Sequence, residues 1–220
     1  MIDLAKKLID FVLHIDRHMA VIIAEYGLWT YGILFLIIFA ETGLVVTPFL
    51  PGDSLLFATG AICARPDTGL SIHLMAGLLW TAAVVGDNLN YWIGYYVGPA
   101  VFHREDSIWL RKKHLERAHA FFEKYGGRAI ILARFVPIVR TFVPFVAGVG
   151  RMKYTRFLPF DIVGGFAWIY LFTYSGFFFG NQPFVKRNFE VVIVAIIVIS
   201  LIPIAVEAFR GWREARSKGK

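Results

Sequence analysis

The sequence predicts an all-α integral membrane protein with transmembrane helices, amphipathic surface helices and two oppositely oriented re-entrant helical hairpins that form an inverted repeat. Of its 220 residues, 57% are hydrophobic, above the roughly 45–50% usual in soluble domains. Two apolar segments are broken by Pro and Gly, so neither forms a continuous helix. Within or beside apolar sequence lie six ionisable residues, although each charge costs about 2.5–3.5 kcal/mol at mid-membrane: Glu41, Asp53, Asp87, Arg134, Arg140 and Asp161.

The N-terminal segment 1–26 is predicted to be an amphipathic helix on the membrane surface. Asp3, Asp10 and Asp16 interrupt it, so we expect no cleaved signal peptide. The uncharged segment 27–40 begins the transmembrane domain, which we place at 27–210. As one helix it would reach about 21 Å, short of a hydrocarbon core of about 30 Å unless the surface helix continues into it. Glu41 is therefore expected deep in the bilayer.

The first broken segment predicts a re-entrant hairpin at about 41–64. It contains two prolines and two glycines before Ser54, and the break is expected near 48–52. Irregular backbone at this depth must be buried in protein or line a wet cavity. Asp53 or Ser54 is a suitable N-cap for the returning half-helix.

Residues 70–102 form one long apolar stretch interrupted by His73 and Asp87, and they suit a full crossing. The following region, 103–128, has seven Lys or Arg residues against four Asp or Glu residues. Its apolar residues share one helical face, which predicts a basic helix at about 105–126 lying on an anionic leaflet.

A second broken segment predicts another re-entrant hairpin at about 129–150. Its middle resembles the first hairpin faintly when Thr47 is aligned with Thr141. Spanning helices are predicted at 162–185 and 191–206, before a basic tail at 211–220. Asp161 would then lie at the membrane interface.

The distribution of basic residues predicts the orientation in the membrane. The basic stretch 103–128, the cluster 151–156 and the C-terminal tail belong in the cytoplasm by the positive-inside rule. The loop 65–69 belongs outside, whereas Lys186 and Arg187 conflict mildly with this topology. The hairpins then open to opposite sides, as in secondary transporters.

The two arginines are candidate phosphate-binding residues. Arg134 and Arg140 lie six positions apart across Pro137. The planar guanidinium fork suits phosphate, and a half-helix N-terminus at depth favours an anion. Alternatively, the arginines only neutralise Glu41 and Asp53 in a structural ion-pair network. Both hypotheses hold together if the substrate displaces one partner.

The acidic residues are candidate proton carriers. Burial in a low dielectric favours the protonated carboxyl, so Glu41 could load and release protons near neutral pH. Asp53 is a second candidate, although it also suits an N-cap. Asp87, Ser54 and Thr141 are candidates for lining the cavity.

Other functional classes have little support. No basic run interleaved with base-stacking aromatic residues lies outside the apolar segments, so nucleic-acid binding is excluded. The single cysteine, Cys63, excludes an internal disulfide and a cysteine-based metal site. No Ser/His/Asp grouping, HExxH motif or Gly-rich phosphate loop occurs, so we expect neither an enzyme, a metal nor a cofactor.

Two motifs resemble the DedA family, whose domain is also called SNARE-associated or VTT. The first motif begins with Glu41-Thr-Gly and ends with Pro-Phe-Leu-Pro-Gly-Asp53-Ser54. The second is Ala133-Arg134-Phe-Val-Pro-Ile-Val-Arg140-Thr. The resemblance extends over about 25–210. Many members have Gly at the position of Ala133.

The resemblance implies a bacterial inner-membrane protein with a role in envelope integrity and dependence on the proton-motive force. Some members are implicated in returning undecaprenyl phosphate across the membrane, and eukaryotic relatives scramble phospholipids. It also implies that Glu41 and Asp53 are the key acidic pair and Arg134 and Arg140 the key basic pair.

The leading hypothesis is a proton-linked flippase for an anionic lipid headgroup, most directly undecaprenyl phosphate. Its expected partners are membrane lipid, protons and an anionic leaflet, and a homo-oligomer is left open. The alternatives are a proton-coupled transporter of a small ion or drug, a phospholipid scramblase, and a non-transporting membrane assembly factor.

Overall fold

The computed structural model describes residues 26–44, 52–66, 68–101, 126–189, 191–196 and 198–199. The described residues are helices joined by turns and short loops, without a strand, which confirms the all-α class for this part of the chain. The helices are α3 (Trp29–Gly43), α4 (Gly52–Cys63), α5 (Ile72–Val101), α7 (Arg128–Ala133), α8 (Pro137–Val149), α9 (Tyr154–Phe179) and α10 (Pro183–Arg187).

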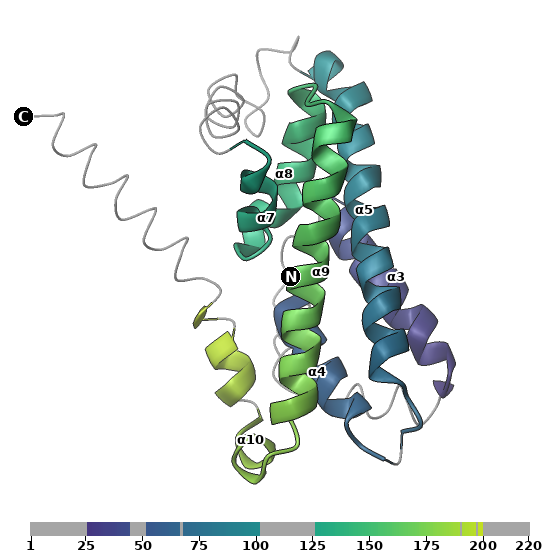
Figure 1. The fold of residues 1–220 in the computed structure, drawn as a ribbon, viewed down its shortest axis with the longest axis vertical. Coiled ribbons are helices and arrows are strands. Elements are labelled where there is room, and N and C mark those ends of the chain that lie inside the picture. Colours follow the sequence, from purple (N-terminus) through teal and green to yellow (C-terminus); the bar gives the residue numbers. More distant parts are fainter. Residues whose placement is uncertain are drawn as a thin grey trace, which may run out of the picture.

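Two long antiparallel helices, α5 and α9, form the centre of the fold (Figure 1). Residues 72–97 of α5 and the whole of α9 are long and apolar enough to cross a membrane. The His73 ring is hydrogen-bonded to the Tyr174 hydroxyl at 2.6 Å, whereas at the other end the Tyr154 hydroxyl donates to Asn88. The numbering therefore rises along one helix as it falls along the other.

The bounds of α5 are close to those of the predicted crossing at 70–102, but those of α9 differ from the predicted span at 162–185. Helix α9 begins at Tyr154, not at 162, and ends at Phe179, not at 185. Pro159 lies early in α9, where its missing N–H removes one backbone hydrogen bond without ending the helix. Gly180 and Pro183 follow the last turn, and Pro183 begins the separate helix α10.

One of the two predicted helix breaks lies within the described residues. The first, predicted near 48–52, falls almost wholly outside them; α3 continues through Glu41 to Gly43 and α4 begins at Gly52, so the first arm does not begin at Glu41. The second lies between α7 and α8. Val136 there has an extended backbone and Pro137 begins α8, because proline disfavours helical geometry in the preceding residue. The depth of these pairs in a membrane stays a prediction.

The two helix pairs contact the central helices in exchanged order: α3 packs on α5 and α4 on α9, while α7 packs on α9 and α8 on α5. Glycines allow the closest approaches. A Cβ on Gly60 would overlap the Thr173 carbonyl oxygen, and one on Gly148 would overlap that of Tyr91. The central helices also contribute glycines to these contacts. Gly176 of α9 lies against the carbonyl of Phe57, and Gly94 of α5 lies against the carbonyl of Phe145.

These contacts define an internal repeat. Phe145 follows Phe57 in the sequence by the same number of residues as Gly148 follows Gly60. The first residue of each pair contacts α9, and the second makes the equivalent contact with α5. A two-fold axis that exchanges antiparallel helices lies perpendicular to them, which in a membrane is an inverted repeat. The alignment of Thr47 with Thr141 was wrong by six positions, because Asp53 is the residue equivalent to Thr141 in this packing.

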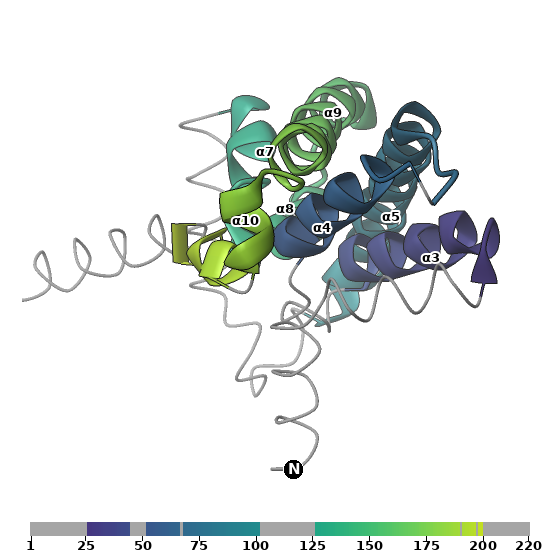
Figure 2. The same ribbon diagram turned by 90° about the horizontal axis from the view of Figure 1, so that it is seen from below.

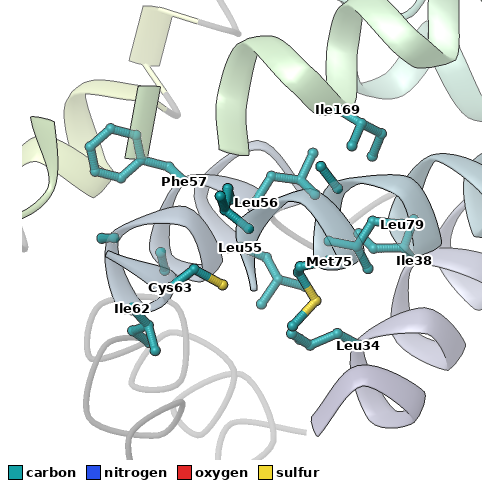
Figure 3. Packing of buried hydrophobic residues seen from close by; sticks show 14 of the residues in the cluster. Leu34, Ile38, Leu55, Leu56, Phe57, Ile62, Cys63, Met75, Leu79 and Ile169 are labelled. Carbon is teal, nitrogen blue, oxygen red and sulfur yellow. The ribbon is translucent and has the colours of Figure 1, made fainter. Parts of the chain in front are cut away.

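The larger hydrophobic core surrounds α4, which lies among α3, α5 and α9 (Figures 2 and 3). Leu56, Leu34 and Met75, from three of these helices, are completely buried. Every described residue of α4 is buried, so this short helix is enclosed by protein although it is too short to cross a membrane. A smaller core lies around Tyr91 and Phe157.

Several predicted segments lie outside the described residues. These are almost all of the N-terminal helix 1–26 and the basic helix 105–126, and the whole tail 211–220. Of the predicted span 191–206, residues 191–196 and 198–199 are described, and they are helical.

We expect Gly60→Ala and Gly148→Ala to destabilise the protein by about 1–3 kcal/mol each, because the added methyl group would overlap a backbone carbonyl oxygen that moves only with its helix. The control is Gly77→Ala within α5, where a Cβ meets nothing within 4 Å and alanine favours the helix. Thermal unfolding in detergent measures the three variants. Equal melting temperatures would contradict this packing.

Candidate functional site

All six ionisable residues identified in the sequence are buried, none being more than 7% exposed. They form two groups, each with one arginine between two carboxylates. We call Arg140, Glu41 and Asp53 the Arg140 centre, and Arg134, Asp87 and Asp161 the Arg134 centre. In an apolar interior a charge is retained only when it is paired in this way.

The Arg140 centre joins both helix pairs. Arg140 is in the first turn of α8, and its Nη1 donates to Asp53 Oδ1 at 2.5 Å. Its Nη2 donates to Glu41 Oε1. Asp53 is in the first turn of α4 and Glu41 in the last turn of α3. One guanidinium fork therefore holds the end of one helix and the beginning of the next.

Trp168 of α9 completes this centre. Its ring lies 4.6 Å from the Arg140 guanidinium carbon, and its Nε1 donates to Asp53 Oδ1 at 2.8 Å. The side chain is fully buried. Sequence analysis missed this residue. The available signal was a tryptophan inside a predicted span, away from the membrane interface where tryptophan is enriched.

Gly52 allows the start of α4 to lie against the ion pair. A Cβ at this position would overlap both carboxylate oxygens of Glu41 and the guanidinium of Arg140. Among the described residues, Glu41 Oε2 and Arg140 Nε have no hydrogen-bond partner although both are buried. The centre thus has one acceptor and one donor that a ligand could engage.

The Arg134 centre lies between α7, α5 and α9. Arg134 pairs with Asp87 of α5 and, at 2.5 Å, with Asp161 of α9. Gly165 leaves room for its guanidinium, since a Cβ there would lie 3.4 Å from Nη2. Asn88 donates to Asp161 and accepts from the Tyr154 hydroxyl, which extends the polar network toward the beginning of α9.

The structure brings three of the four predicted charges together. Arg134 is paired elsewhere, although it interacts electrostatically with Arg140, so the two centres are neighbours. Asp161, which was expected at the membrane interface, is fully buried in the protein as a partner of Arg134, and its depth in a membrane stays a prediction. It is buried because α9 begins before Asp161 and carries it into the bundle, where α7 packs.

The predicted cavity-lining residues are buried near these centres. Asp87 is a partner of Arg134, and Ser54 follows Asp53 with no exposed surface. The Thr141 carbonyl accepts from Asn90, whose amide also donates to the Thr42 carbonyl. Asn90 therefore connects α3 with α8 beside the Arg140 centre. Within the described ranges, no group of three His, Cys, Asp or Glu side chains is placed to hold a metal ion.

Comparison with known proteins supports a membrane protein. Residues 50–178 match the VTT domain. The chain is 52% identical over 218 residues to Protein DedA of Escherichia coli strain K12, with 99% of this chain and 100% of that protein covered. It is 50% identical over 186 residues to an uncharacterized membrane protein of Mycobacterium tuberculosis strain H37Rv, with 84% and 81% covered.

A more distant relative is the inner membrane protein YqjA of Escherichia coli strain K12. It is 35% identical over 158 residues, which cover 70% of this chain and 69% of that protein. No solved structure matches the chain.

We expect Arg134→Ala to destabilise the protein by about 3–5 kcal/mol, because it leaves the buried carboxylates of Asp87 and Asp161 without their cation. Arg128→Ala is the matched control, since Arg128 is exposed on the same helix. Thermal unfolding in detergent compares the two. A stable Arg134→Ala protein would contradict the pairing.

Proposed function

Since the chain belongs to the DedA family of membrane proteins and carries its VTT domain, we propose that it is a proton-linked transporter of an anionic lipid headgroup. Undecaprenyl phosphate in the bacterial inner membrane is the proposed substrate, and its return across the membrane would support the cell envelope. The observation that carries the proposal is the buried Arg140, which is held by carboxylates from two separate helices.

Exchange of a carboxylate for a phosphate is the proposed binding step. With Glu41 and Asp53 ionised, the Arg140 centre has a formal charge of −1 and both terminal nitrogens of Arg140 are occupied. Protonation of the two carboxyl groups changes this charge to +1 and weakens their hold on the guanidinium. A phosphate monoanion then restores neutrality. Binding of the headgroup therefore strengthens as the pH falls.

The second centre extends the proposed path. Arg134 also lies between two carboxylates, although Asp87 and Asp161 both pair with its Nη2, so exchange of a carboxylate for a phosphate is available to it as well. We propose that Arg134 holds the phosphate at a later stage of the crossing. The exchanged packing of the two helix pairs supports alternate opening to the two sides of the membrane.

The proposed orientation follows the positive-inside rule, with a cytoplasmic C-terminus. Protons and membrane lipid are the partners that the cycle requires, and an anionic cytoplasmic leaflet would attract the basic segments of the chain. A homo-oligomer is compatible with the cycle and is not required by it.

A second candidate function is a proton-coupled transporter of a small cation or a cationic drug. The observation that favours it is the excess of acid, because the two centres together contain four carboxylates and two arginines. In that function the carboxylates bind the substrate and the arginines only tune the charge.

Proteoliposomes containing labelled undecaprenyl phosphate test the leading proposal. We expect wild-type protein to move the lipid faster than empty vesicles do, and faster when the loading side is acidic. Arg140→Ala and Arg140→Lys should each lower the rate more than tenfold, because lysine lacks the bidentate fork and charged hydrogen bonds contribute about 1.5–3 kcal/mol. Arg128→Ala, at an exposed position, is the control.

The outcomes separate the two functions. Wild-type rates equal to those of empty vesicles would end the lipid proposal. Retained function in Arg140→Lys, together with inactivity of Glu41→Gln, would favour the cation transporter.

A further inference from the structure

Two hydrogen-bond donors converge on a single oxygen in the Arg140 centre. Asp53 Oδ1 accepts from Arg140 Nη1 at 2.5 Å and from Trp168 Nε1 at 2.8 Å. The donors come from α8 and α9, and all three side chains are buried. This oxygen therefore occupies a site that other helices have shaped for an anionic acceptor.

We infer that the Asp53 carboxylate occupies the place of a phosphate oxygen of the substrate, and that Trp168 Nε1 is a phosphate donor of the transport site. The inference rests on the proposed function and deepens it. A phosphate oxygen matches a carboxylate oxygen in charge and in accepting hydrogen bonds. When Asp53 leaves, the same two donors are available to the headgroup.

The Trp168 indole needs a new hydrogen-bond acceptor when Asp53 leaves. Its N–H is a donor only, and a buried donor without a partner is rare in proteins. The ring also lies against the Arg140 guanidinium, so it retains the fork in position after the carboxylates have left. Trp168 thus favours the phosphate-bound state over an empty one.

The arrangement of the donors defines what the site can hold. Arg140 Nη1 and Trp168 Nε1 meet one oxygen, and Arg140 Nη2 meets a second. Two anionic oxygens of one phosphate group therefore satisfy all three donors, and the headgroup of a lipid monophosphate supplies them. Arg140 Nε, which has no partner among the described residues, adds another N–H on the same side chain.

Binding of farnesyl phosphate, a short lipid monoester, tests this inference by calorimetry on the full-length protein in nanodiscs. The variants are Trp168→Phe, Asp53→Asn and the double variant. We expect Asp53→Asn to bind more tightly than wild type, because the charged internal competitor is gone. Trp168→Phe should weaken binding about tenfold in both backgrounds, since it removes one hydrogen bond to a charged group.

Trp80→Phe is the matched control. Trp80 Nε1 donates to the backbone carbonyl of Ile162 and not to either carboxylate pair, so this variant should bind like wild type.

The double variant separates recognition from positioning. If Trp168 only holds Asp53 in place, its replacement has no effect on binding once Asp53 is Asn, and that result would overturn the inference. If the Trp168→Phe protein does not fold, a spectroscopic measurement that retains Trp168 tests the inference instead. In ¹⁵N spectra of the tryptophan indole groups of Asp53→Asn, farnesyl phosphate should shift one N–H signal. The same signal should be present in the spectrum of Trp80→Phe, which shows that it does not belong to Trp80. The absence of such a shift would overturn the inference.

Failure of the proposed function would be recognised differently. If neither wild type nor Asp53→Asn binds farnesyl phosphate at any pH, both the transport proposal and this inference fail. If both bind, and Trp168→Phe binds equally well in each background, the transport proposal stands and the role of Trp168 is rejected.

Discussion

Arg134 and Arg140, the buried arginines in the described part of the chain, each lie between two carboxylates that other helices supply, and the remaining architecture depends on this pairing. An isolated ion would be too costly in such an interior, whereas a guanidinium fork shared by two carboxylates compensates most of the cost. The pairing of Arg140 requires the end of α3, the start of α4 and the first turn of α8 to meet. The ends of these three helices therefore lie where the three charges meet.

Close backbone packing makes this meeting possible. Gly60 and Gly148 bring α4 and α8 against the two central helices, and Gly52 lets the backbone of α4 contact the ion pair directly. The short helix α4, which cannot cross a membrane, is thereby buried in protein along its whole length. Burial also gives the Arg140 centre the low dielectric on which the proposed linkage of proton and anion binding depends.

The two centres are alike in charge but differ in their surroundings. The Arg140 centre has an indole donor and two unpaired polar atoms among the described residues. The Arg134 centre continues into the amide of Asn88 and the hydroxyl of Tyr154. The proposed anionic headgroup would accordingly be recognised first at Arg140, because Asn88 and Tyr154 extend the hydrogen-bond network at the Arg134 centre.

The amino-acid sequence by itself determined the helical class, the break before Pro137 and the burial of Glu41, Asp53 and Arg140, because proline interrupts a helix and a charge in apolar sequence must be enclosed and paired. Only the tertiary structure decided which carboxylate pairs with which arginine. Asp161 and Trp168 enter the centres through contacts with helices far away in the chain, and helical periodicity contains no information about such contacts. Pairing depends on which helix faces meet, and that is settled by packing between helices.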